Sequence, residues 1–235
     1  MNLGKVGFDP GHYAGANKVG TYSEGDAMLK FGLALQKEYG VFLTRTDGKD
    51  IDLKQRAVLA KKAGCNTLIS LHTNWPESAT GIIIFYSVKR PQDKAIAEQL
   101  GQALAQATGL KFRGAKTRSY ESDPNTDYYG VIRHGVAQGL DHVLIVEHGM
   151  HLEFAKDMDN KINALVKAYG QFLGVDKMEW KDILNLATDS PDKWIEAIDV
   201  AVNAAKADGN LGALEIFKYL PTLIEKVYQK GCESK

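Results

Sequence analysis

Short apolar segments alternate with helical patterns over the first 174 residues, and this alternation limits the folds open to the chain. Segments this short and this uniformly apolar are typical of strands buried on both faces of a sheet. Strands that alternate with helices indicate a parallel sheet, so we predict an α/β fold with a twisted, mostly parallel sheet flanked by helices. The expected strands are 5–9, 41–44, 67–72, 81–87 and 142–147 ("KVGFD", "VFLT", "TLISLH", "GIIIFYS" and "HVLIVE").

Helix start and stop signals lie between these segments. Ser23 is a good N-cap, and the residues after it carry apolar side chains at the spacing of one helix face. Pro91 is placed for a first helical turn, and Gly109 and Gly174 for the ends of helices. The expected helices begin after Ser23 and cover 53–63, 91–109 and about 153–173.

The strand signal stops after Gly174. Three amphipathic segments follow the short link "GVDK", the second with Ser190 as its N-cap and Gly209 at its end. We therefore predict two domains, 1–174 and 177–235, the second a small all-α C-terminal unit.

The composition excludes several classes of partner. The 29 basic and 29 acidic residues cancel, which gives no electrostatic support for binding nucleic acid or an anionic membrane. No apolar run approaches about 18 residues and the start has no signal-peptide pattern, so we expect a cytosolic chain without membrane insertion. Cys65 and Cys232 are too few and too far apart for a disulfide framework. We expect a monomer.

Ionisable residues follow three of the expected strands. His12 comes after the first, His72 ends "TLISLH" and Glu147 ends "HVLIVE". Because the carboxyl ends of parallel strands form one rim, these side chains should meet there. Glu24, in the first turn of the first helix, can reach the same rim.

Two histidines and carboxylates at one rim suit a zinc site. A catalytic zinc takes three protein ligands and leaves a fourth position for water, and two His with one Glu fit this rule. A second carboxylate is then needed to take a proton from the attacking water. Because the two histidines come at matching strand ends, we favour a zinc site over the interpretation that they are unrelated structural histidines.

Three sequence blocks carry a family resemblance. The "DPGH" block with its isolated Glu, "TRTDGKDIDLKQRAVLAKKAGCNTLISLHTN" and "VLIVEHGMHLEF" resemble, in order, the blocks of the amidase-3 type of zinc-dependent N-acetylmuramoyl-L-alanine amidases. The resemblance covers about residues 1–174. Two stretches, "DPGHYAG" and "EHGMHLEF", depart from the usual family pattern and concern substrate contacts more than the metal site.

The resemblance implies a site and a reaction. It implies one Zn²⁺ held by His12, Glu24 and His72, with Glu147 as the catalytic residue. The implied substrate is bacterial cell-wall peptidoglycan, cleaved at the amide between N-acetylmuramic acid and the L-alanine of the stem peptide. It also suggests a phage endolysin of Gram-positive hosts that waits in the host cytoplasm, with 177–235 as a cell-wall-binding unit. A sporulation or mother-cell amidase, an inactive wall-binding protein, and a C-terminal unit that only completes the fold remain alternatives.

Other residues are open to two interpretations. By strand alternation His148 should face away from Glu147 or begin a loop, and His148 and His151 could support the site or contact substrate. We expect an ion pair for Arg45, whereas Arg56 could face a substrate carboxylate. Asn74 could bind substrate or fix its loop, and the segment 119–130 could line the cleft. His134 and His142 are expected to be structural.

Other hydrolase classes lack their motifs. The sequence has no G-x-S-x-G elbow and no P-loop. Cys65 precedes an apolar strand with nothing to activate a thiolate.

Overall fold

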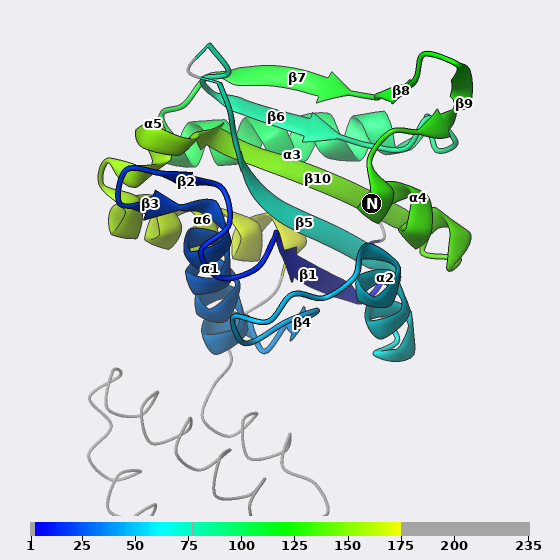
Figure 1. The fold of residues 1–235 in the computed structure, drawn as a ribbon, viewed down its shortest axis with the longest axis horizontal. Helices are drawn as coiled ribbons and strands as arrows, with labels where there is room; N and C mark the ends of the chain where they lie inside the picture. Colours follow the sequence, from blue (N-terminus) through cyan, green and yellow to red (C-terminus); the bar gives the residue numbers. More distant parts are fainter. Residues whose placement is uncertain (1–2, 77, 175–235) are drawn as a thin grey trace, which may run out of the picture. The chain divides into compact units, whose positions relative to one another are not determined.

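The computed structural model describes residues 3–76 and 78–174 (Figure 1). The chain divides into two units, Met1–Asp176 and Lys177–Lys235. The helical domain expected at 177–235 lies outside the described residues. None of the described helices combines the length and apolarity that crossing a bilayer requires.

A six-stranded sheet forms the centre of the first unit (Figure 1). Its order is β4-β1-β5-β10-β6-β7, and every neighbouring pair is parallel except β10 with β6. The mostly parallel sheet is therefore confirmed, with one antiparallel pairing that the sequence did not indicate, because β6 and β7 run opposite to the other four strands. The strands are β1 (Val6–Pro10), β4 (Phe42–Leu43), β5 (Thr67–Asn74), β6 (Ile82–Phe85), β7 (Phe112–Lys116) and β10 (His142–Met150).

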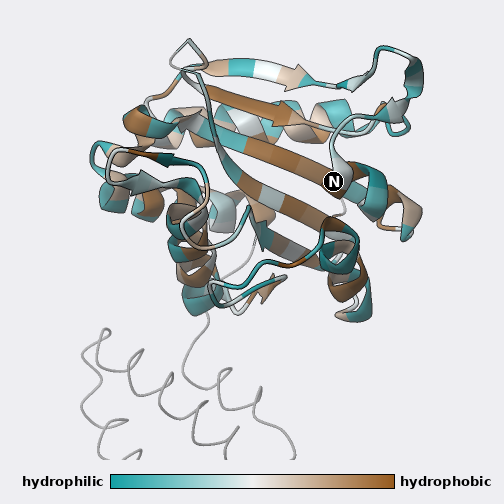
Figure 2. Cartoon of the chain, in the orientation of Figure 1, coloured by the Kyte–Doolittle hydropathy of each residue, from teal (hydrophilic) through white to brown (hydrophobic). Residues whose placement is uncertain are grey.

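Helices cover both faces of this sheet. One face packs against α1 (Glu24–Tyr39), α3 (Asp93–Thr108) and α6 (Met158–Leu173) through side chains such as Phe31, Leu100 and Tyr169. The other face packs against α2 (Leu53–Lys62) and α4 (Gly130–Ala137). The central strands are apolar along most of their length because both faces are covered, as the hydropathy colours of Figure 2 show.

The expected helix ends are close to those observed. Ser23 caps α1 by accepting a hydrogen bond from the Asp26 amide, and Gly109 ends α3 with a positive φ. The third helix begins at Asp93 rather than at Pro91. The fourth is divided into α5 (His151–Ala155) and α6, because Asp157 takes a left-handed conformation between them.

Several elements were not expected from the sequence. Two small hairpins join β2 (Lys18–Val19) to β3 (Tyr22–Ser23) and β8 (Ser119–Tyr120) to β9 (Asp123–Asp127). Helix α4 contains two glycines, which are poor helix formers, so tertiary packing must stabilise it. A Cβ at Gly135 would lie 2.6 Å from Val143, so glycine permits the close approach of α4 to the sheet.

Candidate metal centre

The site begins where β1 ends. His12 follows this strand with φ at 61°, a left-handed conformation that non-glycine residues seldom adopt and that often marks functional sites. The ring of His72, from β5, lies directly against the backbone of Gly11. A Cβ there would lie 2.5 Å from the ring, so glycine is required for the two strand ends to meet this closely.

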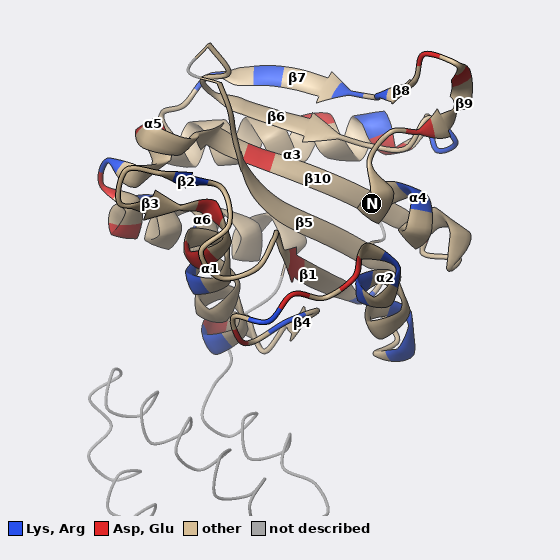
Figure 3. Cartoon of the chain, in the orientation of Figure 1, with Lys and Arg blue, Asp and Glu red and all other residues tan. Residues whose placement is uncertain are grey.

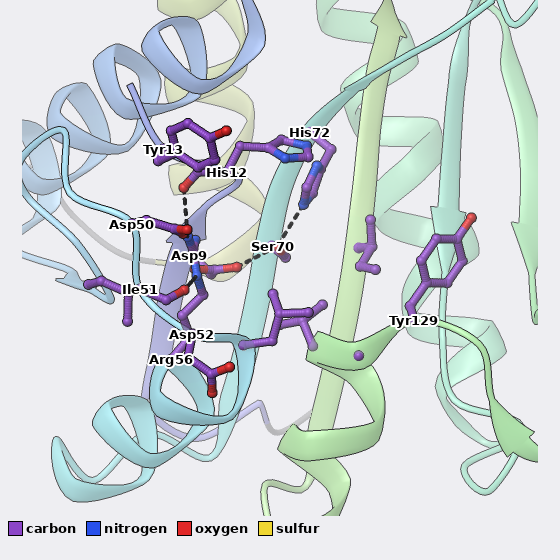
Figure 4. A pocket seen from close by; sticks show the side chains of 14 residues that line it. Asp9, His12, Tyr13, Asp50, Ile51, Asp52, Arg56, Ser70, His72 and Tyr129 are labelled. Atoms are coloured by element: carbon purple, nitrogen blue, oxygen red, sulfur yellow. Dashed lines mark hydrogen bonds and ion pairs between the residues drawn. The ribbon is translucent and has the colours of Figure 1, made fainter. Parts of the chain in front are cut away.

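His12, Glu24 and His72 converge at this rim, as their positions after the strands predicted. One ligand atom from each lies within 4.8 Å of the others. His12 Nε2 is 3.2 Å from Glu24 Oε2, and His72 Nδ1 is 3.0 Å from Glu24 Oε1. The two imidazole rings stand nearly perpendicular, with 4.8 Å between their centroids, and Figure 4 shows them beside each other.

Glu24 is held as a buried carboxylate. It is the first residue of α1, where the helix dipole favours a negative charge. It accepts hydrogen bonds from the Thr73 amide at 3.0 Å and from Asn17 Nδ2 at 2.7 Å. Burial alone would raise the pKa of Glu24, but the hydrogen bonds and charges of His12 and His72 hold that pKa well below its usual range.

This donor set fits a zinc ion. Two imidazole nitrogens and a carboxylate oxygen point at one another, which is the three-ligand set of a catalytic zinc site. The side-chain amide of Asn17 donates a hydrogen bond to Glu24 and lies 3.1 Å from His12 Nε2. The partly positive hydrogens of this amide therefore lie beside the atoms that would hold a cation. The sequence analysis missed Asn17; an asparagine between Gly15 and Gly20, in the loop that leads to Glu24, was the available signal.

Glu147 lies beside this cluster. It is directly opposite His72 in the parallel pairing of β10 with β5, so both side chains project from the same face of the sheet. Its Oε2 is buried and has no hydrogen-bond partner among the described residues. Burial raises the pKa of Glu147 to about 7, against the opposing charge of His72. A carboxylate with this pKa can both accept and donate a proton near neutral pH.

A cavity of about 410 Å³ adjoins the two histidines (Figure 4). Tyr13 and His12 lie on one side of it, and the start of α4 with Tyr129 lies on the other. The loop before α2 contributes Asp50 and Asp52 to the cavity lining (Figure 4), so this part of the wall is acidic. Figure 3 shows acidic residues along this loop in red. The cavity therefore offers space for a substrate next to the candidate metal centre.

The two arginines of the second block bind backbone carbonyls. Arg45 is buried, and its hydrogen bonds go to the carbonyls of Pro10, Gly11, Gly25 and Asp47, so the expected ion pair was wrong. Arg56 pairs with buried Asp9 at 2.9 Å and donates to the His12 carbonyl at 2.6 Å. Its Nε and Nη1 also donate to the carbonyls of Ile51 and Pro10. Arg56 lines the cavity as well, so its contact with a substrate carboxylate stays a prediction.

The remaining histidines differ in how close they lie to the candidate metal centre. His148 faces away from Glu147, as strand alternation predicted, between the His72 carbonyl and the Tyr169 hydroxyl. Burial lowers the pKa of His148 to about 4. His151 lies closer to the site, because its Nε2 is 3.7 Å from Glu24 Oε2 and its Nδ1 is 2.9 Å from Thr73 Oγ1. His142 pairs with buried Asp93, which is a structural role.

The two loop predictions are resolved in part. Asn74 accepts a hydrogen bond from the Trp75 amide, which fixes its own loop. The segment 119–130 forms the β8–β9 hairpin and the start of α4, and its Tyr129 does line the cavity.

Comparison with known proteins identifies one family. The family described as Amidase_3, N-acetylmuramoyl-L-alanine amidase, matches residues 4–165. No curated protein matches the sequence.

Solved structures share the fold. Cwp6 from Clostridium difficile superposes with a TM-score of 0.60 at 24% identity, over 72% of this chain and 28% of that one. The catalytic domain of CwlV, an N-acetylmuramoyl-L-alanine amidase from Bacillus (Paenibacillus) polymyxa var. colistinus, gives 0.55 at 23% identity, over 73% and 98%. The N-acetylmuramoyl-L-alanine amidase AmiC2 of Nostoc punctiforme gives 0.57 at 22% identity, over 72% and 93%.

Proposed function

The chain belongs to the Amidase_3 family of N-acetylmuramoyl-L-alanine amidases, and we propose that it is a zinc-dependent peptidoglycan hydrolase. The bond cleaved is the amide between N-acetylmuramic acid and the L-alanine of the stem peptide. The observation that carries this proposal is the convergence of His12, Glu24 and His72 beside the cavity. These residues would hold one Zn²⁺, which supplies a Lewis acid for the amide carbonyl and makes water more acidic.

The chain's own residues move the proton. We propose Glu147 as the general base: its Oε2, which has no hydrogen-bond partner among the described residues, accepts a proton from the attacking water. The protonated carboxyl then donates the same proton to the leaving amine of L-alanine. Both transfers are favoured by a pKa of about 7, because neither form of Glu147 is then strongly preferred.

The metal assignment is tested with His72→Ala. This variant should lose zinc and activity together, whereas His134→Ala, in α4 and away from the cluster, should keep both. Metal content is measured on purified protein, and activity by the loss of turbidity of purified walls. A full equivalent of zinc in His72→Ala would show that the ligand assignment is wrong.

The bond assignment needs a separate measurement. Digested wall should gain free amino groups without new reducing ends. New reducing ends would instead indicate cleavage of the glycan strand.

We further propose that the enzyme is a monomeric phage endolysin of Gram-positive hosts, held in the host cytoplasm until the membrane opens, with residues 177–235 as its wall-binding unit. A catalytic block followed by a short link and a predicted helical segment supports this role. Expression in a Gram-positive cell should cause lysis only when a pore-forming protein is also produced. Activity confined to walls of sporulating cells would instead favour a mother-cell amidase.

A further inference from the structure

The ring of His72 has a second nitrogen that the metal site does not use. Nδ1 is directed at Glu24, while Nε2 lies 3.1 Å from the hydroxyl of Ser70, two residues earlier on β5. Ser70 is fully buried, and its hydroxyl lies 2.6 Å from Oδ2 of Asp9. A continuous chain of polar atoms therefore runs from the candidate metal ligand to a buried carboxylate on β1.

The direction of each hydrogen bond follows from the carboxylate end. Asp9 as a carboxylate can only accept, so the Ser70 proton is donated to Oδ2. The Ser70 oxygen then has only lone pairs to offer His72, and Nε2 must be the donor. The opposite arrangement would turn the Ser70 proton away from Asp9 and require a proton on Nδ1, which would exclude a cation from that atom.

Asp9 is fixed so that it keeps this role. Its other oxygen accepts from Arg56 Nη1 at 2.9 Å and from the Thr44 hydroxyl at 2.5 Å. Three donors, Ser70 on β5, Arg56 on α2 and Thr44 directly after β4, leave the carboxylate little freedom, and the guanidinium of Arg56 balances its charge. The fold thus sets the geometry of this series of hydrogen bonds before any metal binds.

We propose that Ser70 and Asp9 are positioning residues that keep a proton on Nε2 of His72 and so present Nδ1 as the metal-binding atom. The proposal rests on the zinc site proposed above. A partner on the second ring nitrogen typically changes metal affinity by roughly 10- to 100-fold. The role is distinct from general packing because it depends on one hydroxyl group.

Zinc affinity, measured by competition with a chelating dye, tests this role. Ser70→Ala should bind zinc roughly 10- to 100-fold more weakly than the unaltered chain, and Ser70→Thr, which keeps a hydroxyl, should recover most of the loss. Ser87→Ala is the matched control, because buried Ser87, in the loop after β6, donates to buried Asp127, at the end of β9, at 2.7 Å. Equal affinities for Ser70→Ala and the unaltered chain would overturn the proposal.

The position of the proton on the His72 ring can be measured without an activity assay. Nitrogen-15 NMR of histidine-labelled protein should show a proton on Nε2 of His72, with and without zinc, and Ser70→Ala should make this proton exchange faster with water. A zinc-loaded protein with the proton on Nδ1 would overturn the proposal. If the unaltered chain takes up no zinc, the proposed function fails, and the metal-free spectrum alone decides the role of Ser70.

Discussion

Arg56→Met tests how the loop that carries His12 is held. The side chain of Arg56 is only 2% exposed, and its guanidinium bonds Asp9 and the carbonyls of Pro10, His12 and Ile51. Methionine fills similar volume but leaves the Asp9 carboxylate buried without its opposite charge. Removing one partner of a buried ion pair costs about 3–5 kcal/mol. For a domain of this size the midpoint of thermal unfolding should fall by about 6–20 °C.

The measurement is unfolding of the zinc-free full chain, since bound metal would add its own stabilisation. Amide hydrogen exchange in β1 and β5 reports on the first unit alone. Adding Asp9→Asn to Arg56→Met removes the unpaired charge and should recover part of the loss. The control is Arg133→Met. Within the described part of the chain, the Arg133 guanidinium bonds the Asp127 and Tyr128 carbonyls and the Tyr120 hydroxyl and pairs with no carboxylate, so its loss should lower the free energy of unfolding by about 1 kcal/mol. This reasoning would be refuted if the free energy of unfolding of Arg56→Met lay within about 1 kcal/mol of that of the original chain, or if adding Asp9→Asn restored none of the loss.

Three further outcomes are expected. Glu147→Gln should keep its zinc and lose about 100-fold or more in turnover, because the amide cannot accept a proton; near-normal turnover would exclude the general-base role. His148, with its folded pKa lowered to about 4 from 6.5, stays neutral while the unfolded chain takes up a proton, so stability should fall by about 3 kcal/mol as pH drops from 6.5 to 4. Urea unfolding should show a shallower decline in His148→Gln, and an unchanged slope would contradict the assignment. A Cβ at Gly25 would lie 1.8 Å from the Tyr13 carbonyl oxygen, so Gly25→Ala should displace the His12 loop and weaken zinc binding in the dye assay.

The sequence predicted the parts of the fold that depend on burial and strand ends. His12 follows the end of β1, and His72 and Glu147 lie near the ends of β5 and β10, so the parallel strands bring all three residues to one rim. Glu24 was placed by its position in the first turn of a capped helix. The orientation of His148, on the face opposite Glu147, followed from the two-residue period of β10.

Other features depend on contacts that no local pattern records. An apolar segment is buried on both faces whichever way it runs, so the antiparallel direction of β6 was not encoded in its composition. Strands of two residues, such as β2 and β3, are too short to show a period. Three of the partners of Arg45 are backbone carbonyls far away in sequence, those of Pro10, Gly11 and Gly25, and any residue type can supply a carbonyl.

The pairing of β5 with β10 has a consequence for how folding errors show themselves. His72 and Glu147 lie opposite each other in the register of the two strands. If one strand shifted along the other, no change in a loop could bring these two residues back into alignment. A slip of one residue would bring His148 into the place of Glu147 and turn the carboxylate towards the core. Misregistered molecules should therefore be inactive rather than slow. The fraction of activity regained after refolding should therefore equal the fraction of molecules in which β5 and β10 have paired in the correct register.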